Sequence, residues 1–246
     1  MLIVGSPVSP YVRKILAILH LKGLDYEIDP ITPFYGNDEF SKLSPLRRIP
    51  VLVDGDLVVN DSTVIAEYLD EAYPGVPVLP KAARDRAQAR WIEEYADSRL
   101  GDLCIWGLFF PKAVAPRVFE RAPDEAAIAK VAEVDLPAAL DWLEERAPTD
   151  GFLFGERISV ADLAVACPLR NAAIAGWTPD ATRWPKTTGW LDGIAAQPCY
   201  ARTIAFEPAI LATRPEGRRA ALEAVGVKVA ENSFGTDAPR ASIMLR

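Results

Sequence analysis

The chain has 246 residues, half of them hydrophobic, and carries 27 Lys and Arg against 34 Asp and Glu, a net charge of −7. This length and hydrophobic content allow a buried core of one or two domains. The negative balance, without any basic run, argues against nucleic acid and anionic membranes as partners. No stretch approaches roughly 18 uninterrupted apolar residues and no signal-peptide pattern is visible, so we expect a cytoplasmic protein.

Cysteine and histidine are too few and too scattered for several kinds of chemistry. Cys104, Cys167 and Cys199 are odd in number and far apart, which argues against a disulfide framework or a thiolate metal site. His20 is the single histidine, so a metal site built on several histidines is excluded. Because His20 falls in an apolar helical pattern, a structural role is favoured over a Ser-His-Asp triad. We therefore expect no metal.

The first 80 residues predict a compact α/β unit. Asp54-Gly55 between two β-rich runs is typical of a hairpin, and Asp61-Ser62 suits a helix cap. The order of strand, helix, strand, hairpin and helix is the layout of a thioredoxin-like domain. The expected elements are a strand in 1–5, a helix over 10–22, a strand at 25–29, a short helix within 37–44, a hairpin over 50–59 and a helix after Ser62.

A Pro- and Gly-rich stretch, "EAYPGVPVLP" at residues 71–80, ends this unit. Beyond it the β signal fades and helical spacing dominates. We therefore divide the chain into an α/β domain over 1–76, a linker over 77–84 and an all-helical domain with a C-terminal extension over 85–246. The expected helices start near Ala83, cover 128–143, start at Ser159, and cover 184–195 and 216–225; "NSFGTDAPRAS" at 232–242 is expected to be a loop.

Four local motifs together resemble the cytosolic glutathione transferase superfamily. They are "SPVSPYVRKILAILHLKGLDYE", "SPLRRIPVLVDGDLVVNDSTVIAEYL", "YPGVPVLP" and "ISVADLAVA". The resemblance covers roughly residues 1–206 and implies an α/β plus all-α fold class, with a thioredoxin-like N-terminal domain followed by an all-helical C-terminal domain. It also implies glutathione as co-substrate, a small-molecule electrophile as the second substrate, and a homodimer.

Ser6 and Ser9 are the candidates for activating the glutathione thiol, whose free pKa lies near 8.5 as in other thiols. A hydroxyl that donates to sulfur beside the positive end of a helix favours the thiolate. In the family the catalytic serine stands four residues before the arginine of the first helix in the phi and theta classes, and seven before it in tau and zeta. Both templates fit, because Arg13 follows Ser9 by four residues and Ser6 by seven.

Ser9 is slightly favoured because it would lie at the helix N-terminus, with Pro10 at the first helical position. The alternative is that Ser9 only caps the helix and Ser6 carries the catalytic hydroxyl, or that neither activates a thiol. Ser6 also stands where omega- and beta-class members carry cysteine. A serine there argues against their mixed-disulfide chemistry, since a hydroxyl cannot form one.

The segment Ile49-Pro50-Val51 resembles the family's cis-proline element. The resemblance implies that glutathione pairs with the Val51 backbone like a short added strand. Arg48, just before it, stands where many members have Lys or Gln near the glycyl carboxylate, which an arginine can bind with two hydrogen bonds. Its neighbour Arg47 is expected to be a solvated cation. The alternative for Pro50 is an ordinary edge-strand proline.

Asp61-Ser62 stands where the family usually has Glu-Ser. The resemblance implies that backbone N–H groups and the Ser62 hydroxyl hold the γ-glutamyl carboxylate while Asp61 meets its ammonium. The shorter Asp weakens that second contact, and either residue could be only a helix cap. Arg13 is expected to be structural, and the Ser159/Asp162 pair resembles the family's folding cap.

The electrophile site of the family is lined by the first helices of the second domain. Aromatic residues at helical spacing are more often core than binding site. The tail after Glu207 lies beyond the resemblance and is open to several roles: covering the cleft, packing on a second subunit, or remaining disordered. The candidates for the electrophile site are Tyr11, Trp106, Phe109 and Phe110.

The expected function is a glutathione transferase that directs the glutathione thiolate at an apolar electrophile. Two alternatives stay open. One is a non-catalytic glutathione- or ligand-binding protein on the same scaffold, because fold does not fix function. The other is a zeta-like glutathione-dependent isomerase, although "SPVSPYVR" lacks the Ser-Ser-Cys sequence of that class.

Overall fold

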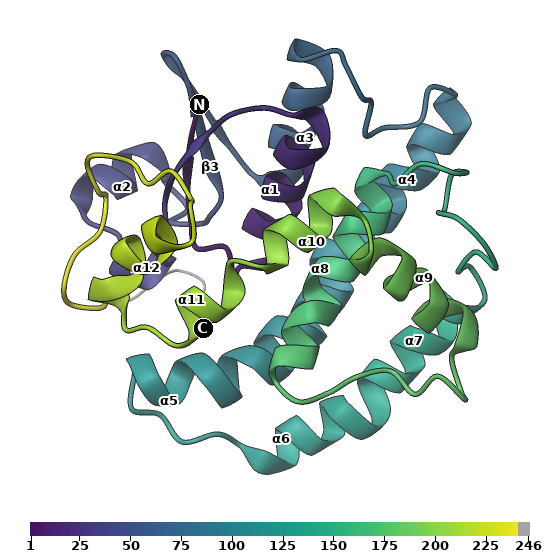
Figure 1. Cartoon of the computed structure of the whole chain (residues 1–246). Coiled ribbons are helices and arrows are strands. Elements are labelled where there is room, and N and C mark those ends of the chain that lie inside the picture. The colour runs from purple at the N-terminus through teal and green to yellow at the C-terminus, as the bar shows by residue number, and fades with distance from the viewer. Residues whose placement is uncertain (241–246) are drawn as a thin grey trace. The chain divides into compact units, whose positions relative to one another are not determined.

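The computed structural model describes residues 1–240. Packing divides these residues into two compact units, one of residues 1–76 and 198–240 and the other Pro77–Gln197. The sequence predicts a helical domain that runs to the C-terminus, whereas in the structure residues 198–240 pack with residues 1–76. The predicted fold class, a thioredoxin-like α/β domain and an all-helical domain, is confirmed (Figure 1).

The first unit is built on a four-stranded sheet in the order β2-β1-β3-β4. β1 runs parallel to β2 and antiparallel to β3, and β3 and β4 form the predicted hairpin. Gly55 adopts φ +63° in the hairpin turn, a conformation that favours glycine. The strands are β1 (Leu2–Val4), β2 (Glu27–Asp29), β3 (Val51–Asp54) and β4 (Leu57–Asn60).

Helices cover this sheet because their apolar stripes need burial. The predicted stripe of the first helix is confirmed, since Val12, Ile15, Leu16 and Leu19 are all fully buried. Gly23 ends that helix in the left-handed conformation. The helices of residues 1–76 are α1 (Pro10–Lys22) after β1, η1 (Pro33–Tyr35) and α2 (Asp38–Leu43) after β2, and α3 (Ser62–Ala72) after β4.

The C-terminal part of the chain adds a second set of helices to the first unit. α10 packs along α1, as Figure 1 shows. His20 on α1 joins the two helices, because its Nδ1 lies 2.8 Å from the hydroxyl of Thr203 on α10. Its Nε2 lies 2.9 Å from the hydroxyl of Tyr26, which precedes β2. The elements are α10 (Pro198–Ile204), α11 (Glu207–Leu211), η4 (Pro215–Gly217) and α12 (Arg218–Ala224).

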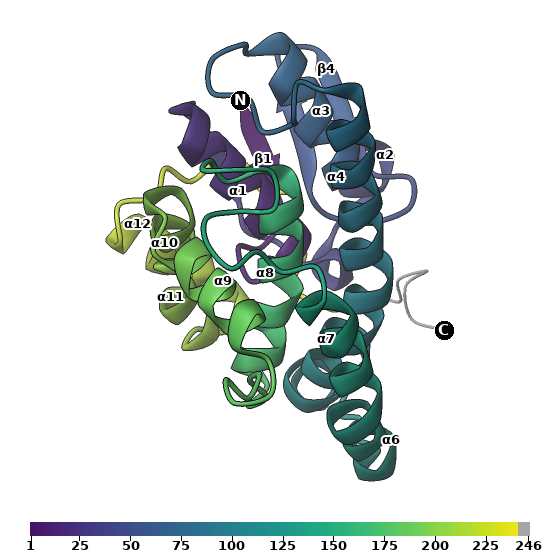
Figure 2. The ribbon, with the colours of Figure 1, turned by 90° about the vertical axis from the view of Figure 1, so that its right-hand side faces the viewer.

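The second unit consists of helices around the long central helix α8. Figure 2 shows α8 between α9 and α4. The predicted helix over 128–143 is one continuous run of α6, η3 and α7, and α4 continues directly into the π-helical η2. The elements are α4 (Ala83–Tyr95), η2 (Ala96–Val114), α5 (Ala115–Val118), α6 (Glu125–Lys130), η3 (Val131–Asp135), α7 (Leu136–Glu144), α8 (Val160–Ile174) and α9 (Pro185–Ala195).

A capping box starts α8, as the sequence predicts. The fully buried Asp162 carboxylate accepts hydrogen bonds from the Ser159 N–H and hydroxyl, at 2.8 and 2.6 Å. It also accepts bonds from the Leu153 N–H and the Trp190 indole. These donors compensate the burial of the carboxylate, so the pair has the structural role expected of it.

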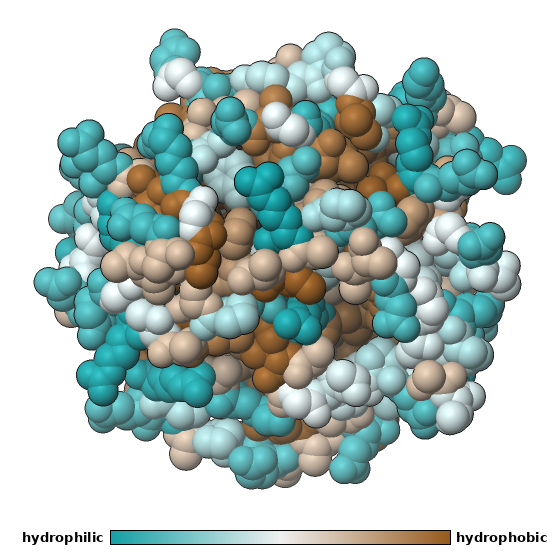
Figure 3. Space-filling model, viewed as in Figure 1, coloured by the Kyte–Doolittle hydropathy of each residue, from teal (hydrophilic) through white to brown (hydrophobic). Residues whose placement is uncertain are grey.

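The predicted loop after Asn232 contains no helix as far as residue 240, and its last two residues lie outside the described part of the chain. Large apolar side chains are exposed on both units, including Leu46, Val64 and Trp91. On the face shown in Figure 3, hydrophobic residues are interspersed with hydrophilic ones. Between residues 1 and 240, none of the helices is both long enough and apolar enough to span a bilayer.

A buried ion pair joins α1 to α11. Arg13 and Glu207 are 0% and 1% exposed, and Nη2 lies 2.7 Å from Oε1. Arg13 also donates to the Val8 carbonyl at 3.2 Å. Removing one partner of a buried pair leaves the other charge without compensation in a medium of low polarity. Arg13 is therefore structural, as expected, and it secures the C-terminal helices to the first unit.

We expect Glu207→Ala to lower the free energy of unfolding by about 3–5 kcal/mol because it strands the Arg13 charge. Urea unfolding followed by circular dichroism measures this. Lys42→Ala, which breaks the exposed Lys42–Glu39 pair, is the matched control, with an expected change below about 1 kcal/mol. Equal effects of the two substitutions would contradict the structural role of the Arg13–Glu207 pair.

Candidate functional site

The register of the sheet gathers three candidate segments at one end. Val4, the last residue of β1, pairs with Val51, the first residue of β3, and Val51 pairs with Asn60, the last residue of β4. Antiparallel pairing therefore places the chain that leaves β1, the chain that enters β3 and the chain that leaves β4 side by side. Those are the segments of Ser6 and Ser9, of Arg48–Pro50, and of Asp61–Ser62.

Gly5 allows two of these segments to come close together. Its φ of +147° favours glycine, and its N–H donates to the Asp29 carbonyl at 2.8 Å. A Cβ at Gly5 would lie 2.6 Å from Cγ2 of Val12 and 3.0 Å from Cβ of Ile49. Only a residue without a side chain fits between α1 and the Ile49 segment, a requirement that no local sequence pattern reveals.

The two serines lie in different environments at the start of α1. Ser9 is the N-cap residue and is half-buried, whereas Ser6 is 3% exposed. The Ser9 carbonyl accepts from the Arg13 N–H at 2.8 Å, and the Ser9 N–H donates to the Ser6 carbonyl at 2.9 Å. The Ser9 hydroxyl makes no capping hydrogen bond. It lies at the positive end of a 13-residue helix and can donate to an anion there.

The bond between Ile49 and Pro50 is cis, as the resemblance implies. Val51, however, does not have the exposed backbone expected of it. The residue is fully buried and pairs with β1 on one side and β4 on the other. In an antiparallel strand the N–H and C=O of one residue point to the same neighbour, so those of Val51 face a partner strand. Ile49 precedes the strand, and no described residue hydrogen-bonds its peptide groups.

The two adjacent arginines have different surroundings: Arg47 is part-buried and structural, and Arg48 is exposed. Arg48 is exposed, and its guanidinium makes no hydrogen bond or ion pair within the described residues. The buried Ser44 holds the Arg48 backbone, since its hydroxyl donates to the Arg48 carbonyl at 2.8 Å and accepts from the Arg48 N–H at 2.9 Å. This turn fixes where the Arg48 side chain starts and leaves its charge free for a ligand.

The expectation that Arg47 is a solvated cation is wrong. Its guanidinium is part-buried, donates to the carbonyls of Pro33 and Gly36 at 3.0 and 2.9 Å, and lies 5.6 Å from the Phe40 ring centroid. It also donates to the Ser41 hydroxyl at 2.5 Å. Sequence alone does not show which of two adjacent arginines is buried. Here the backbone of Arg47, with a φ of 49°, turns the Arg47 side chain inward.

Asp61 and Ser62 start α3. The Asp61 carboxylate caps the helix through one oxygen, Oδ1, which accepts from the Thr63 and Val64 N–H groups at 2.9 and 3.4 Å. Oδ2 takes no part in the cap, and the residue is exposed. Ser62 is 5% exposed at the first helical position. The cap role is thus present, and one carboxylate oxygen remains available to a cation.

The aromatic candidates fall into both units. Tyr11 is half-buried in the first turn of α1. Trp106, Phe109 and Phe110 lie on η2 of the helical unit, where the rings of Trp106 and Phe110 are 5.2 Å apart. Phe109 is buried and belongs to the core, which leaves Trp106 and Phe110 with accessible surface in that unit.

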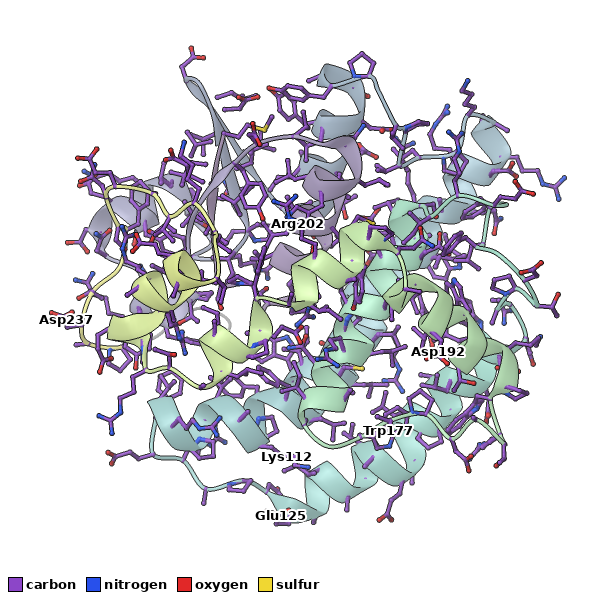
Figure 4. The ribbon with its side chains drawn as sticks, in the orientation of Figure 1. Lys112, Glu125, Trp177, Asp192, Arg202 and Asp237 are labelled. Atoms are coloured by element: carbon purple, nitrogen blue, oxygen red, sulfur yellow. The ribbon has the colours of Figure 1, made fainter. Side chains whose placement is uncertain are left out.

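The remaining reactive side chains have a structural role. Burial, together with the positive charge of Arg202 on α10 (Figure 4), lowers the pKa of His20 to about 4 against the opposing effect of a backbone hydrogen bond. His20 is therefore neutral at neutral pH. Burial raises the pKa of the Cys104 and Cys199 thiols, so neither is a thiolate. Across residues 1–240, no three His, Cys, Asp or Glu side chains are grouped for metal binding.

Two family models match the chain. One is the glutathione S-transferase N-terminal domain, over residues 3–77, and the other is the glutathione S-transferase C-terminal domain, over residues 81–193. Together they cover both units up to the start of the C-terminal helices. The residues from Pro198 onward lie outside both matches.

Individual relatives agree with the family models. The chain is 31% identical to glutathione S-transferase 3 of Zea mays, over 83% of this chain and 93% of that protein. It is 34% identical to a zeta-class glutathione S-transferase of Euphorbia esula, over 70% and 75%. Among solved structures, a glutathione S-transferase from Rhodospirillum rubrum F11 is 26% identical, with a TM-score of 0.73 over 82% of this chain and 91% of that one.

Proposed function

The chain belongs to the glutathione S-transferase family. We propose that it binds glutathione at the end of the sheet where the segments of Ser6 and Ser9, of Arg48–Pro50 and of Asp61–Ser62 meet, and that it transfers the glutathione thiolate to an apolar electrophile. The observation that carries the proposal is the Ser9 hydroxyl, which lies at the N-terminus of α1 and makes no capping hydrogen bond. A donor in that place can stabilise an anion together with the helix dipole. The gathering of the three ligand segments around it supports the same conclusion.

The charges of the site complement those of glutathione, which has two carboxylates and one ammonium at neutral pH. The free guanidinium of Arg48 pairs with the glycyl carboxylate. Because the Thr63 and Val64 N–H groups already donate to Oδ1 of Asp61, the Ser62 N–H and hydroxyl accommodate the γ-glutamyl carboxylate, and Oδ2 of Asp61 meets the ammonium. The peptide groups of Ile49, in place of those of Val51, pair with the cysteinyl residue.

Activation then follows from the position of the sulfur. The Ser9 hydroxyl donates to it, and the α1 dipole favours the negative charge, so the thiol pKa falls below its free value of about 8.5. The thiolate attacks an electrophilic carbon and forms a carbon–sulfur bond, while the leaving group departs with the displaced electron pair. Within the helical unit, Trp106 and Phe110 offer aromatic surface for an apolar substrate, and within the first unit Tyr11 is a separate candidate. Such conjugation, in the cytoplasm, suits detoxification.

Titration of the thiolate ultraviolet band of glutathione bound to the purified protein tests this proposal. If Ser9 is the donor, Ser9→Ala raises the pKa of the bound thiol and lowers turnover about tenfold to a thousandfold, the scale of losing one aligned donor to an anion. Ser6→Ala is the matched control and changes both much less. The reverse ranking would assign the role to Ser6, and saturable binding without thiolate would favour a non-catalytic binding protein.

Arg48→Ala is expected to weaken glutathione binding about tenfold or more, because the glycyl carboxylate loses a charged partner. Isothermal titration calorimetry measures the affinity, and the thiolate titration shows an unchanged pKa of the bound thiol. Lys42→Ala removes an exposed cation of the same unit and serves as the control, with no expected change. An unchanged affinity of the Arg48 variant would return this residue to the solvated surface.

A zeta-like isomerase is the second candidate, favoured by the similarity to the zeta-class relative. That reaction would use Ser6, which lies seven residues before Arg13. Turnover of a maleyl-type substrate without turnover of simple aromatic electrophiles would establish it. Conjugation of aromatic electrophiles that depends on Ser9 would exclude it.

We also propose that the protein is a homodimer, and that exposed apolar side chains of the first unit take part in the interface. Leu46 and Val64 are 56% and 52% exposed, and burying them would be favourable. Sedimentation equilibrium is expected to give twice the monomer mass, and Val64→Glu is expected to shift the equilibrium toward monomer. Val225→Glu, at a residue 50% exposed on the C-terminal part, is the control. A monomeric wild type would refute the proposal.

A further inference from the structure

Residues 227–240, termed here the C-terminal strap, follow α12 and run back along the sheet unit. They lie beyond the matched family domains, which end at residue 193. Figure 1 shows the strap as the yellow segment beside α2 and α12, and Figure 4 labels Asp237 at its outer edge. The strap attaches at three successive places.

The first attachment extends the sheet. β2 is an edge strand, and Val229 forms a parallel bridge with Ile28. The Ile28 N–H donates to the Lys228 carbonyl at 2.9 Å, and the Ala230 N–H donates to the Ile28 carbonyl at 3.0 Å. The side chains of Val227 and Ala230 are buried. The strap therefore covers an edge that would otherwise expose unpaired backbone groups.

The second attachment is at Asp29, the last residue of β2 and fully buried. Its carboxylate accepts from the Ser233 hydroxyl at 2.9 Å, the Phe234 N–H at 2.7 Å and the Arg219 guanidinium at 3.3 Å. All of these donors belong to the C-terminal part of the chain. A buried carboxylate needs such donors, so Asp29 and the strap depend on each other.

The third attachment runs along η1 and the start of α2. Gly235 bridges Gly36, and the Arg240 guanidinium lies 2.5 Å from the Asp38 carboxylate. Backbone hydrogen bonds join residues 234–240 of the strap to residues 34–37. They link the Asn37 N–H to the Phe234 carbonyl at 2.8 Å, the Thr236 N–H to the Tyr35 carbonyl at 2.8 Å, and the Arg240 N–H to the Phe34 carbonyl at 2.6 Å.

Arg47, which directly precedes residues of the proposed glutathione site, holds the same segment. Its guanidinium donates to the Pro33 and Gly36 carbonyls, which are not the ones that the strap uses. Residues 33–37 are thus held between the strap and Arg47. Arg47 is followed directly by Arg48 and by Ile49, which the proposed function assigns to glutathione.

We propose that the C-terminal strap is a positioning element of the glutathione site. It orders η1 through residues 33–37, and the ordered carbonyls hold Arg47, which in turn fixes the backbone from which Arg48 and Ile49 bind the ligand. This inference rests on the proposed function for the identity of the ligand. The strap contributes no group to glutathione itself.

The test compares Thr236→Pro, which removes the N–H donated to Tyr35, with Thr236→Ala, which keeps it. In the free protein, hydrogen exchange of residues 33–47 is expected to accelerate in the proline variant only. Its dissociation constant for glutathione rises about threefold to thirtyfold, the range for substitutions that act through a coupled network. The pKa of the bound thiol stays at the wild-type value, because Ser9 is untouched.

Ser233→Ala removes a hydroxyl that donates to Asp29 and accepts from the Gly235 N–H, and it provides a second variant if the proline variant does not fold. It is expected to act in the same direction, and Ser233→Thr to restore the wild-type values. Unchanged exchange of residues 33–47, or faster exchange with an unchanged dissociation constant, would overturn the inference. A wild type that does not bind glutathione overturns the proposed function instead, and the exchange comparison still decides whether the strap orders residues 33–47.

Discussion

The pairing of β1 with β3, and of β3 with β4, is the constraint on which the site depends. Val51 is the shared residue, because it pairs with Val4 on one side and Asn60 on the other. Antiparallel pairing brings the end of β1, the start of β3 and the end of β4 to one edge. Gly5 then allows α1 and the Ile49 segment to approach. Residues from three separate parts of the chain thereby form one surface.

The molecule separates charges that stabilise the fold from charges that can meet a ligand. Arg13, Asp29 and Asp162 are fully buried, and donors or an opposite charge compensate each of them. Arg48 and Asp61 are exposed, with the Arg48 guanidinium and one oxygen of Asp61 left without a described partner. Because such a charged side chain starts from a fixed backbone and has no partner to lose, it needs little rearrangement to bind a ligand of opposite charge.

Local patterns predicted much of the first unit, and motifs pointed to the candidate site residues. Asp54-Gly55 marked the hairpin, the apolar spacing of α1 marked its buried face, and Ser159 with Asp162 marked the start of α8. These features depend on neighbours in sequence, so sequence is sufficient for them. The serines, Arg48 and the Ile49-Pro50 bond were located by motif. Arg47 and Val51 were misjudged, because their surroundings come from distant segments.

The sequence by itself determined the family, the order of helices and strands in the first 76 residues, and the residue types of the candidate site, since local spacing and motifs carry all of these. Only the tertiary structure decided that the C-terminal segment packs on the sheet unit and that Asp29 anchors it across some two hundred residues of chain. The physical reason is that a hydrogen bond, or the compensation of a buried charge, depends on the distance between two groups in space. The number of residues between two groups along the chain does not say which distant donor will lie beside a given carboxylate.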